Sequence, residues 1–196
     1  MTRARIALAA VACALAVAAA HVARANDVEG VDFPAQVVPV PGAAPLVLSG
    51  AGVRHFLLFD VYAVGLYLPA LAPSAEAAIS APGRKRVSIA MLRDVDAAQF
   101  VDSLEKALRA NHDEAAMQAL APSVARFESI FTSLQVVKKG TRIAIDQVPD
   151  AGTVVAIDGT PREPIPDAAF YPALLRNWLG EHPVQADLKR ELLGAH

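Results

Sequence analysis

In much of the first half of the chain, short apolar segments are separated by turn residues. The densest apolar stretch, Val53 to Leu68, is rich in β-branched and aromatic residues and ends at Pro69. Such a composition predicts two strands in the middle of a sheet, which we expect to turn near Phe59-Asp60. The preceding stretch, Asn26 to Gly52, has short apolar pieces between prolines. Proline is tolerated at sheet edges, so this stretch predicts short edge strands.

A helical period appears next. Asp96 is a suitable N-cap, and apolar residues recur at helical spacing from Ala97 to Leu108. This pattern predicts a helix over Asp96–Ala110. Asp113 can cap a second helix, which we expect to end near Leu120 because Pro122 follows. A third helix is predicted from Ser123 to Phe131.

The remaining pattern returns to strands and then to helices. The turn sequence Pro149-Asp150-Ala151-Gly152 separates two apolar segments, and Gly180 stands where a helix-ending glycine is expected. Strands followed by helices, with tight turns, predict an α+β fold with a mainly antiparallel sheet. The further predicted elements are a helix over Ser74–Ser80, strands over Arg86–Met91, Arg142–Gln147 and Thr153–Ile157, and helices over Tyr171–Leu179 and Pro183–Leu193.

The first 25 residues are typical of an export signal. Arg3 and Arg5 precede an apolar run from Ile6 to Ala20, and small residues stand at both ends of Ala23-Arg24-Ala25. We therefore expect residues 1–25 to be a signal peptide that is removed. The alternative is an uncleaved membrane anchor, although the run is short for a span. Residues 26–196 are then a single domain, periplasmic or secreted.

Composition and charge exclude some classes of function for that domain. The chain has 196 residues, 54% of them hydrophobic, and a net charge of −2. Removing three arginines with residues 1–25 gives (18 − 3) − 20 = −5. An acidic domain without a basic stripe argues against nucleic acid as a partner. No second apolar stretch reaches about 18 residues, so stable membrane insertion after cleavage is not expected.

Metal and cofactor chemistry have little support in the sequence. Cys13, the one cysteine, leaves with the signal, and His55, His112, His182 and His196 show no ligand spacing. There is no phosphate-binding glycine loop and no nucleophile elbow. We expect neither a bound metal nor a cofactor.

One charged residue stands out. Arg54 lies within the most apolar part of the chain, and a guanidinium that cannot lose its proton needs a partner when buried. It can reach solvent or pair with an acid such as Asp60, or it can lie at the floor of a cleft and bind an anionic ligand. Asn177, within an apolar helix, is either a satisfied buried amide or a donor facing such a cleft.

The order of several motifs resembles the chalcone isomerase family, in the style of its bacterial secreted members. They are Leu48-Ser-Gly-Ala-Gly-Val-Arg54, Ala63-Val-Gly-Leu-Tyr-Leu68, the helix beginning at Gln99-Phe100, and Ala173-Leu-Leu-Arg-Asn-Trp-Leu-Gly180. The resemblance spans about Val28 to Leu193. It implies an open-faced β-sandwich, a large antiparallel sheet with helices packed on one face.

The resemblance also implies a ligand site. Arg54 keeps the arginine that favours and positions an anion in the plant enzymes. Tyr62 falls on a strand threonine and keeps a hydroxyl, whereas Phe100 falls on a helix tyrosine and Ala107 on a helix asparagine. Asn177 falls on a late serine or threonine. The groups that would stabilise the ketone side of a chalcone are therefore largely absent.

Two functions follow as hypotheses. The first is a binding domain for a small apolar anion, a fatty acid or a phenolic compound, held through Arg54 without catalysis, as in family members thought to bind fatty acids. The second is a cofactor-free isomerase of the intramolecular lyase type, with Arg54 and Tyr62 as its catalytic residues. A structural, partner-binding domain is a third possibility, and the sequence leaves the oligomeric state open.

Overall fold

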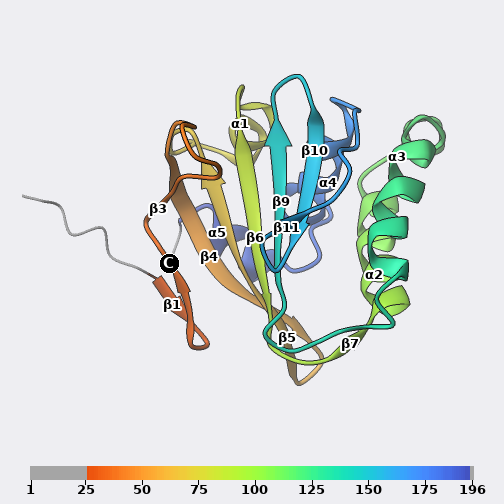
Figure 1. The fold of residues 1–196 in the computed structure, drawn as a ribbon, viewed down its shortest axis with the longest axis horizontal. Coiled ribbons are helices and arrows are strands. Elements are labelled where there is room, and N and C mark those ends of the chain that lie inside the picture. The colour runs from red at the N-terminus through yellow and green to blue at the C-terminus, as the bar shows by residue number, and fades with distance from the viewer. Residues whose placement is uncertain (1–25, 195–196) are drawn as a thin grey trace, which may run out of the picture.

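A curled, seven-stranded antiparallel sheet forms the centre of the molecule (Figure 1). The computed structural model describes residues 26–194, so the predicted signal peptide and His196 lie outside the described residues. The strand order in the sheet is β11-β10-β9-β6-β5-β4-β3, and two small sheets pair β1 with β2 and β7 with β8. The strands are β1 (Asn26–Val28), β2 (Val31–Phe33), β3 (Gln36–Val37), β4 (Leu46–Phe56), β5 (Phe59–Leu68), β6 (Lys85–Met91), β7 (Val95–Asp96), β8 (Val136–Val137), β9 (Arg142–Val148), β10 (Gly152–Ile157) and β11 (Thr160–Pro161).

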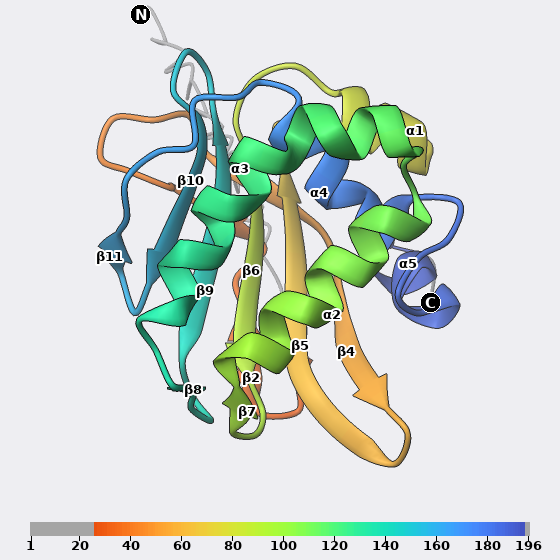
Figure 2. The ribbon, with the colours of Figure 1, turned by 90° about the vertical axis from the view of Figure 1, so that its right-hand side faces the viewer.

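Helices cover one face of this sheet (Figure 2). Side chains alternate between the faces of a strand, and Tyr62, Val64 and Leu66 of β5 join the main core with residues of all the helices. Ala63 and Tyr67 point the other way and pack with Phe33 of β2. The predicted α+β fold is confirmed. The helices are α1 (Ala75–Ser80), α2 (Ala97–Ala110), α3 (Glu114–Thr132), α4 (Phe170–Leu179) and α5 (Ala186–Leu192).

The β4–β5 hairpin differs from its prediction. β4 begins at Leu46 and includes the segment Ser49 to Gly52, which was expected to precede the strand. Phe56 pairs with Phe59, so the chain turns at Leu57-Leu58 and not at Phe59-Asp60. Gly50 and Gly52 lie within the strand and do not mark a loop. α5 packs on them, with its backbone against Gly50 and side-chain ends of Glu191 and Leu188 against Gly52.

Pro122 does not break the chain as predicted. It lies inside α3, a single helix of 19 residues. A proline in a helix removes one backbone hydrogen bond and crowds the preceding turn. Here Met117 and Leu120 before it, and Phe127 and Phe131 after it, are all buried in the main core. Packing along both halves of the helix therefore outweighs the local cost of the proline.

Capping predictions were confirmed where they depended on local contacts. The Asp96 carboxylate accepts hydrogen bonds from the backbone N–H groups of Ala98 and Gln99 at 2.9 and 3.2 Å. Gly180 follows α4 as expected, but its backbone is extended and not left-handed. Its small size is needed because a β-carbon would overlap the Asn111 side-chain oxygen.

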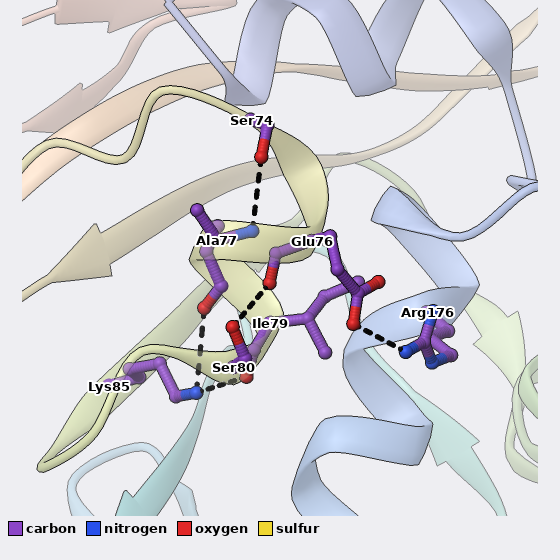
Figure 3. A network of polar contacts seen from close by, with 8 residues as sticks. Ser74, Glu76, Ala77, Ile79, Ser80, Lys85 and Arg176 are labelled. Atoms are coloured by element: carbon purple, nitrogen blue, oxygen red, sulfur yellow. Dashed lines mark hydrogen bonds and ion pairs between the residues drawn. The ribbon is translucent and has the colours of Figure 1, made fainter.

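A polar network fixes α1 between the sheet and α4 (Figure 3). The Ser74 hydroxyl accepts a hydrogen bond from the Ala77 N–H at 3.2 Å at the start of the helix. At its end, the buried Lys85 ammonium donates to the carbonyl oxygens of Ala78 and Ile79 at 3.4 and 2.5 Å. Arg176 of α4 pairs with Glu76 at 3.0 Å. Lys85 therefore takes the role of a cation at a helix C-terminus.

Burial of Lys85 predicts a pH dependence of stability. Burial lowers the pKa of Lys85 from 10.5 to about 8. Between these values the folded state has released a proton that the unfolded state still binds, so the free energy of unfolding rises with pH. We expect an increase of about 2 kcal/mol from pH 8 to pH 10 in urea titrations.

The variant Lys85→Met should lack this rise, because it removes the titrating group. Above about pH 10, Tyr62 and Tyr67 act in the opposite direction, since the pKa of each is raised to about 12 in the fold. An equal rise in the free energy of unfolding below pH 10 in the parent protein and in Lys85→Met would show that another group causes it.

Candidate functional site

Arg54 and Tyr62 lie opposite each other on adjacent antiparallel strands. They are direct partners in the pairing of β4 with β5, so their side chains emerge on the same face of the sheet. That face is the one covered by α2 and α4, since Tyr62 belongs to the main core. An irregularity in the pairing follows Arg54, and such bulges redirect side chains. Arg54 and Tyr62 therefore lie on neighbouring antiparallel strands, on the face of the sheet that the helices cover.

Arg54 has no acidic partner within residues 26–194. Its guanidinium donates a hydrogen bond to the carbonyl oxygen of the adjacent His55. Asp60, the acid that the sequence offered as a partner, instead binds the His55 ring nitrogen at 2.6 Å. The Arg54 side chain is partly buried, so a permanent positive charge lies at the edge of the core without a neutralising carboxylate.

Gln185 holds the backbone on both sides of Arg54. Its side-chain oxygen accepts a hydrogen bond from the His55 N–H at 2.9 Å, and its side-chain nitrogen donates to the Val53 carbonyl oxygen at 3.2 Å. β3 pairs with β4 only near Leu46. The backbone N–H and C=O groups of β4 around Arg54 can therefore form hydrogen bonds with a side chain. Gln185 is therefore a positioning residue for Arg54. No local pattern in the sequence indicates this contact, since Gln185 and His55 are 130 residues apart.

The Tyr62 hydroxyl lies between the sheet and α4. It accepts a hydrogen bond from the indole N–H of Trp178 at 3.1 Å, and the Phe100 ring of α2 lies edge-on to the Tyr62 ring at 6.5 Å. Burial raises the pKa of Tyr62 to about 12, although the Trp178 hydrogen bond and the Arg54 charge oppose the rise. Tyr62 is therefore a neutral phenol at ordinary pH, and its own proton can be donated.

Arg54 and Tyr62 both present hydrogen-bond donors, the kind of group that binds anions. Arg54 supplies fixed donors and a full charge, and Tyr62 supplies a neutral donor. A phenol with a pKa of about 12 is a poor general base near neutral pH. His55, the other candidate base close in sequence, is exposed and bound to Asp60. The arrangement suits binding of a carboxylate or phenolate better than proton abstraction.

Ala107 and Asn177 are the remaining candidate residues, on α2 and α4. Both are buried, and the Asn177 side-chain nitrogen donates to the Leu104 carbonyl oxygen at 2.9 Å. Its side-chain oxygen has no hydrogen-bond partner within residues 26–194. Phe100 and Ala107 are about 10 Å apart along α2. The structure thus brings Arg54, Tyr62 and Phe100 together and places Asn177 beside a different part of α2.

Two cavities lie outside this group. One, of about 10 Å³, is bounded by apolar side chains of α2, α3 and α4, including Leu104, Phe127 and Leu174, together with Glu105 and Glu128. The other, of about 260 Å³, lies at the β9–β10 turn and is bounded by Gln147 to Gly152, Pro166 to Ala168, and Tyr171. Neither has Arg54 or Tyr62 in its lining, so the expected cleft at Arg54 does not coincide with either cavity.

The described part of the chain holds no candidate for a metal site or a membrane-spanning helix. Residues 26–194 contain no group of three or more His, Cys, Asp or Glu side chains that could hold a metal ion. Within the same residues, no helix has both the length and the apolar character needed to cross a bilayer.

Comparisons with known proteins identify the fold. A family model described as chalcone isomerase-like matches residues 25–194. A crystal structure of an Arabidopsis thaliana fatty-acid binding protein is similar, with a TM-score of 0.62 and 18% sequence identity, over 84% of this chain and 92% of that chain. No curated protein sequence matches significantly.

Proposed function

This chain belongs to the chalcone isomerase-like family, and from that premise we propose that it is an exported domain that binds a small apolar anion. The ligand is a fatty acid or a phenolic compound, and Arg54 is its anchor. The observation that carries this proposal is the unneutralised charge of Arg54 beside the neutral donor Tyr62. A partly buried guanidinium without an acid favours an anionic guest, because the guest supplies the missing partner.

The apolar part of the ligand has a natural position in the helical layer. Trp178, Phe100 and the aromatic side chains behind them continue inward from Tyr62. The cavity of about 10 Å³ between α2, α3 and α4 accommodates no more than a single water. Ligand sites usually measure several hundred Å³, so binding requires these helices to separate. The similar fold of a fatty-acid binding protein supports this proposal.

Native mass spectrometry of protein purified from the periplasm tests export and binding together. The protein mass is expected to correspond to a chain that begins at Asn26, because the small residues before it fit signal cleavage. A chain that still begins at Met1 and remains in the cytoplasm would contradict export. We also expect an additional mass of a fatty acid or phenolic compound that is lost on denaturation, and its absence from every preparation, including protein incubated with these compounds, would contradict ligand binding.

Chalcone cyclisation is expected to be slow. Phe100 and Ala107 have no side-chain hydrogen-bond donors, and each missing donor to a developing oxyanion costs on the order of 10²–10³ in rate. We therefore expect little or no acceleration over the spontaneous ring closure of a hydroxychalcone, followed by loss of its absorbance. Rapid, saturable closure that Arg54→Ala abolishes would instead favour the isomerase, with Arg54 and Tyr62 as catalytic residues.

A further inference from the structure

The turn of the β4–β5 hairpin exposes four consecutive large apolar side chains. The exposed fractions are 59% for Phe56, 81% for Leu57, 96% for Leu58 and 53% for Phe59. The hairpin projects beyond the rest of the sheet at its lower end (Figure 2). Single exposed leucines are common on protein surfaces, but a continuous apolar tip on a projecting hairpin indicates an interaction site.

The backbone of the turn supports a role for these side chains. Leu57 has a φ of 55°, in the left-handed region that favours glycine or asparagine. A two-residue turn between paired strands usually carries those residues, which are also polar or small. Leucine at this position costs conformational energy and exposes apolar surface. The side chains are therefore not explained by the needs of the hairpin itself.

We propose that this tip, residues 56–59, docks the domain on a lipid bilayer by inserting into its interfacial region. Two residues of strand span about 7 Å, which matches the roughly 5–10 Å depth of interfacial apolar insertion. A two-residue turn cannot supply the roughly 1,200 Å² that a stable protein interface buries, so a second copy of the chain fits this tip less well. A fluid acyl layer can surround a projecting tip on all sides.

The charges near the tip suit lipid headgroups. The Arg93 guanidinium lies over the Phe59 ring at 4.4 Å, and Lys138 and Lys139 are exposed in the neighbouring loop. That loop is fixed to the same end of the sheet, because the Lys139 N–H donates to Asp94 at 2.7 Å. Three acids at this end, Asp60, Asp94 and Asp96, equal these cations in number and are held by the His55 ring, the Lys139 N–H and the start of α2. The cations therefore act through local contacts with headgroups, because this end has no excess of positive charge. Cations at this level can contact lipid phosphates while the tip enters the acyl region.

Docking would bring Arg54 to the membrane surface. Arg54 is two residues from Phe56 on the same strand, and a fatty acid in a bilayer holds its carboxylate at headgroup depth. This inference goes beyond the proposed ligand binding and does not require it. Variants at the tip should change membrane association, whereas Arg54→Ala should change ligand affinity, so the two proposals can fail separately.

A local fluorescence reporter tests the inference in the full chain. Leu58→Trp places an indole at the tip, and Leu71→Trp places one at an equally apolar position, 71% exposed, beyond the opposite end of β5. Each is mixed with vesicles of phosphatidylcholine and phosphatidylglycerol that carry brominated acyl chains. The native Trp178 is buried and provides the background. Any attachment through residues 1–25 is common to all three proteins.

We expect strong quenching at Leu58→Trp and little at Leu71→Trp. The double variant Leu57→Ser/Leu58→Ser should also reduce the tip-dependent vesicle partition at least about tenfold, whereas Leu71→Ser should not. Equal quenching at both positions would overturn the proposal. So would concentration-dependent self-association that the double serine variant abolishes without any vesicle effect, because the tip would then be a contact between copies of the chain.

Discussion

Replacing Arg54 with alanine is expected to weaken binding of a fatty-acid or phenolic anion about ten- to a hundredfold. A charge-assisted hydrogen bond contributes roughly 1.5–3 kcal/mol, which corresponds to that change in affinity. Within residues 26–194, Arg54 has no acid that would compete with the ligand. Isothermal titration with the compound identified by native mass spectrometry measures the loss.

Two further variants distinguish direct contact between Arg54 and the ligand from a long-range effect of net charge. Arg54→Lys should restore only part of the affinity, since an ammonium cannot form the two-pronged contact of a guanidinium with a carboxylate. Arg142→Ala removes the same charge at an exposed position of β9 and should leave affinity unchanged. Equal losses for Arg54→Ala and Arg142→Ala would mean that long-range attraction, and not contact, governs binding.

Stability decides whether Arg54 is a ligand-binding or a structural residue. Its side chain makes one local hydrogen bond and is only partly buried, so the alanine variant should melt close to the parent protein. An unfolded Arg54→Ala would show that the arginine supports the fold. A folded variant with undiminished affinity would move the ligand elsewhere, and the cavity of about 260 Å³ at the β9–β10 turn is then the first place to examine.

Local signals in the sequence predicted the fold well. Asp96 and Asp113 cap helices because their side chains reach backbone N–H groups only a few residues away. The predicted break at Pro122 is wrong because a proline is tolerated inside a helix when both halves of the helix are well packed. That packing involves residues far away in the sequence, so no local pattern reveals it. The two-residue strands β7 and β8 were missed for a related reason, since segments this short have no period to detect.

The candidate site was predictable only in part. Arg54 stands out in sequence as a charge in an apolar stretch, and its pairing with Tyr62 follows from the strand order. Trp178 is adjacent to Asn177, a candidate site residue, but no sequence pattern indicates that its indole N–H donates to Tyr62 across 116 residues. The sequence around Gln185 does not distinguish it from other polar surface residues. Its function arises only because α5 returns to the edge of β4.

The packing of α5 on β4 makes Gly50 the most sensitive position near the site. A β-carbon at Gly50 would overlap the backbone carbonyl oxygen of Glu191 and lie 2.9 Å from the carbonyl carbon of Leu192. Backbone atoms of a helix cannot move singly, so α5 must shift as a unit. We expect Gly50→Ala to lower the free energy of unfolding by about 3 kcal/mol, at the upper end of overpacking costs.

Gly52→Ala is the matched control, because it adds the same methyl group two residues away on the same face of β4. There the new β-carbon would meet the ends of the Glu191 and Leu188 side chains, which can rotate away. Its cost should stay below about 1.5 kcal/mol in urea titrations. Since α5 follows directly after Gln185, a shifted helix should also loosen the hydrogen bonds of Gln185 to Val53 and His55. Gly50→Ala is therefore expected to weaken ligand binding as well as stability, and equal stabilities of the two variants would contradict the rigid packing of α5 on which both effects depend.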